Sequence, residues 1–61
     1  MTVSNIKLAR VKKGMTQTEA AKALGISQGF LSLIENKQKS VDMEILIRMA
    51  TLYDAKYDEI I

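Results

Sequence analysis

The strongest constraint on the fold is a stretch, residues 16–36, that ends one helix and begins another within a few residues. Thr16 and Glu19 have the spacing of a capping box, in which each side chain satisfies a free backbone N–H of the first turn. Gly25 supplies the left-handed residue that ends a helix, and Ser27 is a preferred cap for the next one. The sequence therefore predicts two short helices that cross steeply at a tight turn.

Such a pair of helices is the build of a helix-turn-helix, a motif that places its second helix in the major groove of DNA. In the rest of the chain, apolar residues recur at intervals of three and four, which predicts helices and no strands. Three further helices are expected. The first begins after Ser4 and ends near Lys13, the next is capped by Asp42 and ends near Tyr53, and the last covers residues 57–61. We expect an all-α, five-helix fold that forms one domain over residues 1–61.

Apolar residues that recur on one face of each expected helix form the predicted core. The segment that Asp42 caps is apolar on more than one face, with Ile45 and Leu52 left over. Together with Tyr57, Ile60 and Ile61, Leu52 predicts an apolar surface that a partner covers. For Ile60 the alternative is a core that wraps under the C-terminus. The predicted core residues are Ile6, Met15, Ala21, Leu24, Ile26, Leu31, Ile34, Leu46, Met49, Ala50 and Tyr53.

The residue types that the chain lacks argue against an enzyme. It has no cysteine and no histidine, which removes thiolate metal sites and the commonest general base. The acidic residues Asp54, Asp58 and Glu59 do not have the spacing of a calcium loop. We therefore expect no metal, no cofactor and no small-molecule ligand.

No apolar run approaches the ~20 residues that span a membrane. The segregation of charge is more informative than the net charge of +2. Residues 1–39 carry seven basic and two acidic residues, a balance of +5, while 40–61 carry two basic and five acidic, a balance of −3. This asymmetry predicts one face that meets a polyanion, although an uneven scatter of solvated charges would give the same count. A cytoplasmic, nucleoid-associated protein is expected.

The outward face of the second motif helix carries the predicted base contacts, Gln28, Gly29, Ser32 and Leu33. Gln28 lies in the first turn, and a glutamine amide can pair with adenine through two hydrogen bonds. Glycine reads no base but lets the backbone come close. Leu33 can contact a thymine methyl or a sugar, or instead fold back against the following loop and the helix that Asp42 caps.

Polar and basic residues around that helix are the predicted phosphate contacts. Gln17 lies in the first turn of the preceding helix, where free N–H groups favour an anion. The alternative for Gln17 is that it is an ordinary polar residue of the first turn. The alternative for the residues after the second motif helix is that they form a loop exposed only to solvent. The predicted phosphate contacts are Gln17, Ser27, Asn36, Lys37, Lys39 and Ser40.

Arg10 and Glu35 are charged residues beside core positions of their helices. Because each neighbours a core position, we predict a partly buried pair that ties the first helix to the third. The alternative role for Arg10 is a phosphate contact.

The sequence resembles the Cro/C1-type (XRE-like) helix-turn-helix family, which includes the lambda and 434 phage repressors and many small bacterial regulators. The residues that carry the resemblance are 15–17, Ala21, 24–28 and 31–36. The resemblance implies a compact five-helix, lambda-repressor-like fold and dimeric binding to a palindromic operator. We expect a sequence-specific transcriptional regulator, a repressor, that acts as a homodimer. The resemblance also implies that Gln17 contacts phosphate and Gln28 a base.

Four positions depart from the family pattern. Lys37 and Asp54 stand where glycine is frequent, Val41 where proline is frequent, and Lys56 where a serine or threonine cap is frequent. These departures concern the loop after the third helix and the start of the last one. An alternative function on the same fold is a protein-interaction module, such as an antirepressor-like or antitoxin-like partner.

Overall fold

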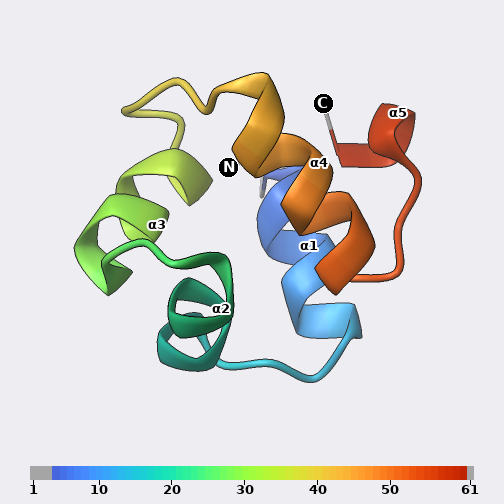
Figure 1. Cartoon of the computed structure of the whole chain (residues 1–61), viewed down its shortest axis with the longest axis horizontal. Helices are drawn as coiled ribbons and strands as arrows, with labels where there is room; N and C mark the ends of the chain where they lie inside the picture. Colours follow the sequence, from blue (N-terminus) through green and yellow to red (C-terminus); the bar gives the residue numbers. More distant parts are fainter. Residues whose placement is uncertain (1–3, 61) are drawn as a thin grey trace.

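The computed structural model describes residues 4–60, which form five α-helices and no strand. This confirms the predicted all-α, five-helix fold. The side of the molecule that carries α3 lies away from α5, with α1 and α4 between them (Figure 1). None of the helices within 4–60 has the length and apolar character needed to cross a bilayer. The helices are α1 (Asn5–Lys12), α2 (Gln17–Leu24), α3 (Gln28–Glu35), α4 (Met43–Leu52) and α5 (Tyr57–Ile60).

Four of the helices begin with the same device. The side chain before the helix accepts a hydrogen bond from the backbone N–H three residues later, which satisfies one donor that the helix leaves free. At α2 the capping box is complete, because Glu19 Oε1 also accepts from the Thr16 N–H at 2.9 Å. The capping residues are Ser4, Thr16, Ser27 and Asp42.

The same four helices are followed by a residue with left-handed backbone. After α1 and α2 this residue is glycine, Gly14 with φ of 78° and Gly25 with φ of 74°. After α3 and α4 it is Lys37 with φ of 61° and Asp54 with φ of 55°. The turn after α3 still closes, since the Gln38 N–H donates to the carbonyl five residues back at 2.8 Å. A side chain in this conformation costs about 1 kcal/mol, so the departures from glycine strain the turns without changing them.

The core lies between all five helices. Leu31 and Met49 are its largest fully buried side chains, and Ala20 and Ala21 let α2 approach closely. The sequence analysis missed two core members, Ala9 and Ala20, and gave a core position for Ile60 only as the alternative. Three predicted core residues, Met15, Ile26 and Ala50, are instead partly buried at its edge.

Ile60 lies in the core of its own chain, with 3% of its surface exposed. The reason is that α5 folds back against both α1 and α4. This contradicts the expectation that a partner covers Ile60 and agrees with the alternative, a core that wraps under the C-terminus. Leu52 is half-buried against the core, so Tyr57 alone stays exposed in the predicted C-terminal surface, while Ile61 lies outside the described residues.

The exposed apolar residues of α4 are not the ones that the sequence singled out. Ile45 and Leu52 pack on the edge of the core. Met43 and Ile47 are 64% and 51% exposed. These two are four residues apart and so share one face of the helix.

A buried ion pair joins α1 to α3. Arg10 Nε lies 2.7 Å from Glu35 Oε2 and Arg10 Nη2 lies 3.2 Å from Oε1, so the contact is bidentate. Arg10 Nη1 also donates to the carbonyl of Met15 at 2.9 Å. The hydrogen bond to Glu35 raises the pKa of Arg10 and holds its charge despite burial. All three guanidinium nitrogens of Arg10 thus donate within the fold. This argues against the alternative role of Arg10, a phosphate contact.

Removal of Glu35 should be far more damaging than removal of an exposed carboxylate. Glu35→Ala leaves the Arg10 charge buried and unpaired, which costs roughly 3–5 kcal/mol. The matched control is Glu44→Ala, because Glu44 forms an exposed pair with Arg48 at 2.8 Å. That pair is worth at most about 0.5 kcal/mol. Urea denaturation followed by circular dichroism measures both, and equal losses would contradict a buried pair.

Tyr53 gives a second prediction because its buried hydroxyl has no hydrogen-bond partner within residues 4–60. Burial raises its pKa to about 12. The unfolded tyrosine ionises near pH 10, so the native state loses stability as the pH rises from 10 toward 12. Tyr53→Phe removes this loss and leaves no hydroxyl unsatisfied. In denaturation experiments the variant should match or exceed the parent at pH 7 and gain about 1 kcal/mol on it by pH 11. A difference that does not change with pH would contradict this.

Candidate nucleic-acid interface

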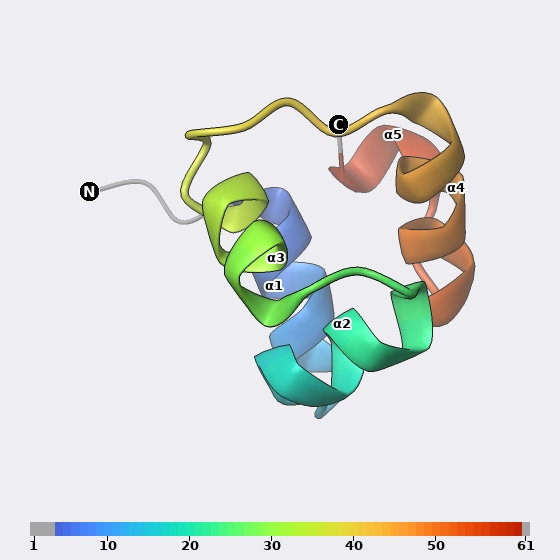
Figure 2. The same cartoon turned by 60° about the vertical axis from the view of Figure 1, so that its left-hand side comes forward.

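The outward face of α3 carries the four residues that the sequence assigned to base contacts. Gln28 and Gly29 are exposed, Ser32 is half-buried, and Leu33 is 37% exposed. The helix lies at the surface in front of α1, with α2 crossing beside it (Figure 2). Residues on this face are therefore open to a partner that approaches α3.

A chain of hydrogen bonds runs from the buried ion pair to this face. Gln17 Nε2 donates to Glu35 Oε1 at 3.0 Å. Gln28 Nε2 in turn donates to Gln17 Oε1 at 3.1 Å. Gln17 on α2 thus connects the buried end of α3 to its exposed first turn.

The charge on Glu35 sets the direction of both amides. An ionised carboxylate only accepts, so Gln17 must present its NH2 group to it. The Gln17 oxygen then faces Gln28 and accepts a hydrogen bond from the NH2 group of that residue. Gln28 keeps its oxygen and one N–H for a further partner, a donor and acceptor pair on one oriented amide.

Glycine is not needed at position 29 by the fold itself. A Cβ built on Gly29 meets no atom within 4 Å. Gly29 is the second residue of α3, so it costs the helix less than the about 1 kcal/mol by which glycine is worse than alanine in a helix interior. The residue therefore weakens α3 slightly and leaves its outward surface flat.

Basic and polar side chains border this face after α3. Asn36, Lys37, Lys39 and Ser40 are all exposed in the loop that leads to α4. Ser27 is exposed at the start of α3, where its hydroxyl already accepts from the N–H of the third helical residue. The predicted phosphate contacts other than Gln17 thus lie at the two ends of α3, with Ser27 at its start and the others after its end.

Gln17 differs from these residues because it is half-buried and already bonded. One N–H of its amide is used by Glu35, which leaves the second N–H available. The capping box satisfies the N–H groups of Thr16 and Glu19, so those of Gln17 and Thr18 stay outside it. The pKa of Glu19 is lowered because its carboxylate accepts from the Thr16 backbone, and its negative charge lies at the same helix end.

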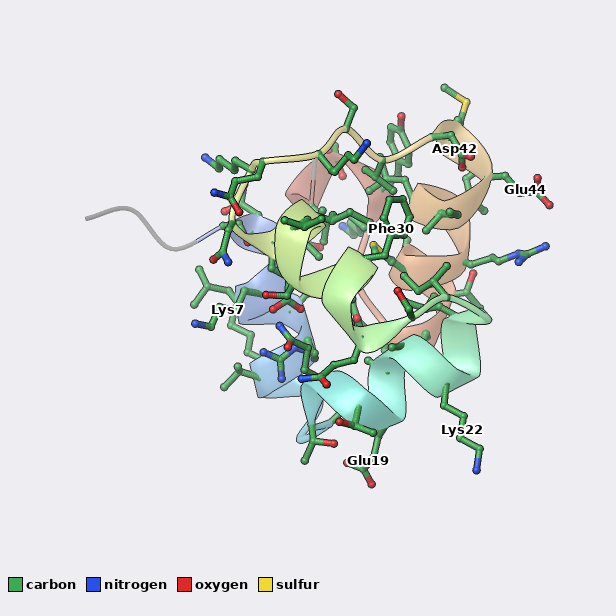
Figure 3. All side chains as sticks on the ribbon, turned by 90° about the vertical axis from the view of Figure 1, so that its left-hand side faces the viewer. Lys7, Glu19, Lys22, Phe30, Asp42 and Glu44 are labelled. Atoms are coloured by element: carbon green, nitrogen blue, oxygen red, sulfur yellow. The ribbon has the colours of Figure 1, made fainter. Side chains whose placement is uncertain are left out.

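Lys7 is a residue of this surface that the sequence analysis missed. It is exposed on α1, and Figure 3 shows it at the edge of the face on which Phe30 is seen. Phe30 was also missed, and it packs against the core from α3. No spacing within either segment signals these placements, because both depend on how α1 and α3 meet.

The part of the chain that the structure describes holds no group of three or more metal-ligating side chains. Its polar surface around α3 consists of amides, hydroxyls and ammonium groups. Such groups donate to phosphate oxygens and to base edges.

Comparison with known proteins agrees with this geometry. A helix-turn-helix family matches residues 6–60. The chain is also 38% identical over 53 residues to the HTH-type transcriptional regulator ImmR of Bacillus subtilis (strain 168). This match covers 87% of the chain and 42% of that relative, so the chain spans less than half of its length.

These matches confirm the helix-turn-helix family that the sequence analysis predicted, and the relative carries the name of a transcriptional regulator. The matched region contains the capping box, the tight turn, the α3 face and α4. The chain belongs to the Cro/C1-type helix-turn-helix family.

Proposed function

We propose that this chain is a transcriptional repressor that binds a palindromic DNA operator as a homodimer. The observation that carries the proposal is the amide relay, in which Glu35 directs Gln17 and Gln17 directs Gln28 at the exposed start of α3. At the surface this relay presents a donor and an acceptor side by side, which a ligand with the matching pair of groups can bind. A base edge in the major groove has such a pair.

Gln28 is the residue that we assign to base recognition. Its free oxygen can accept from adenine N6, and its remaining N–H can donate to adenine N7. The amide is oriented before DNA binds, which reduces the entropy lost in forming both bonds. Ser32 and Leu33 extend the contact along α3, with the hydroxyl on a polar edge and the leucine on a thymine methyl or sugar.

Gly29 supports close docking of α3. Since the fold does not require glycine there, its absent side chain leaves space for the DNA to approach the helix backbone. Few hydrogen-bonding groups remain on this face beyond Gln28. Much of the specificity would then come from DNA shape.

The phosphate contacts are assigned to Gln17, Ser27, Asn36, Lys37, Lys39 and Ser40. Because several lie in one loop after α3, they can hold the backbone of one half-site and fix the register of the helix. Two copies would place their α3 helices in successive major grooves, about 10 bp apart. We further propose that the protein acts in the cytoplasm on nucleoid DNA, where it blocks transcription by occupying its operator.

Two substitutions separate base reading from phosphate binding. Gln28→Ala should cost roughly 1–3 kcal/mol and relax the preference at one base pair. Lys39→Ala should weaken binding to all duplexes alike and lower the salt slope by about one. The affinities are measured by fluorescence anisotropy, at several salt concentrations, with duplexes that the protein retains from a randomised pool.

The control for the lysine is Lys56→Ala, since Lys56 is exposed between α4 and α5. It should leave the affinity and the salt slope unchanged. Retention of no duplex by the parent protein, or equal affinity of the parent and Gln28→Ala for all of them, would contradict the proposal.

A further inference from the structure

The strongest unassigned surface is on α4, on the side turned away from the core. We propose that this face, formed by Met43, Glu44, Ile47 and Arg48, is where a second copy of this chain docks, with the two α4 helices antiparallel. The inference rests on the proposed homodimer and gives it a contact surface different from the C-terminal one that the sequence suggested.

Two large apolar side chains form the centre of this face. Met43 and Ile47 are the most exposed large apolar residues of α4, at 64% and 51%. They lie one helical turn apart on the same side. Their exposure costs solubility unless a partner covers them.

The charges beside this stripe show which partner fits. Glu44 and Arg48 are also one turn apart and lie next to the apolar pair. Glu44 Oε1 and Arg48 Nη2 are 2.8 Å apart within the chain, and both side chains are largely exposed. Figure 3 shows Glu44 projecting outward from the start of α4.

A two-fold axis at the level of residue 46 makes this face complementary to itself. Antiparallel α4 helices then place Glu44 of each copy opposite Arg48 of the other, on the same side of the apolar stripe. A parallel arrangement would instead put the Glu44 and Arg48 of the two copies on opposite sides of the apolar stripe, so that no Glu44 would meet an Arg48 across the contact. The charge order therefore selects a closed, isologous pair of two copies.

The contact leaves the DNA-facing side of both copies free. None of its residues belongs to the outward face of α3 or to the basic loop. Because α4 has ten residues, about 15 Å of helix, the contact alone is smaller than a standard interface. We therefore expect weak association in solution, which two half-sites on one DNA duplex would strengthen.

Charge exchange tests the antiparallel pairing. Glu44→Arg gives a chain with two arginines on this face, and Arg48→Glu gives a chain with two glutamates. Each variant alone should associate at least about tenfold more weakly than the parent, because like charges then face each other. An equimolar mixture should form heterodimers at least as strongly as the parent. Sedimentation equilibrium at near-millimolar protein and low salt measures this without DNA.

A second variant tests the same surface through its apolar centre. The chain has no cysteine, so Ile47→Cys introduces a single thiol close to the proposed axis. With glutathione disulfide as oxidant it should form a disulfide-linked dimer at least about tenfold faster than Val11→Cys, given an effective concentration raised by docking. Val11 is the matched control because it is an exposed apolar residue of α1, at 57%.

Absence of heterodimers in the mixture, together with equal cross-linking of the two cysteine variants, would overturn the proposal. This failure is distinct from failure of the proposed DNA binding. The α4 measurements contain no DNA, whereas Gln28→Ala should weaken DNA binding and leave self-association unchanged.

Discussion

The buried carboxylate of Glu35 is the group on which the rest of the arrangement depends. Only 1% of its side chain is exposed, so its charge must be satisfied by donors within the protein. Arg10 supplies two of them from α1, and Gln17 supplies a third from α2. One carboxylate at the end of α3 thus fixes how three helices meet.

The same requirement reaches the surface through the two glutamines. A carboxylate cannot donate, so each amide in the series has one acceptable orientation. Gln28 is consequently held with a donor and an acceptor outward at the first turn of α3. In this account, the interaction that stabilises the helix crossing also prepares the residue that reads DNA.

Local signals in the sequence predicted the helices well. Ser4, Thr16, Ser27 and Asp42 are caps whose hydrogen bonds span only three residues, so their pattern is visible in the sequence itself. Gly25 ends α2 as expected. The pair of Arg10 and Glu35 was also predictable, since each residue lies beside a core position of its helix.

Features that depend on tertiary packing were not predictable in the same way. Ile60 lies near the C-terminal end of the sequence, and no local pattern shows that it is buried. It is buried because α5 folds back against the core. Met43 and Ile47 are exposed for the converse reason, because the core contacts the opposite side of α4. The contact between Gln17 and Gln28 joins two helices, and no periodicity within one helix reports it. The turns at Lys37 and Asp54 were also not predictable from local signals, because both residues adopt the left-handed backbone although neither is glycine.

The most direct test of the central claim is NMR relaxation of the glutamine side-chain amides in the free protein. Gln38 is the internal reference, because it lies exposed in the loop after α3. The account predicts order parameters for the Gln17 and Gln28 side chains close to the rigid-backbone value of about 0.85, with Gln38 below about 0.6. Equal mobility of all three side chains would show that no relay holds Gln28 in place before DNA binds.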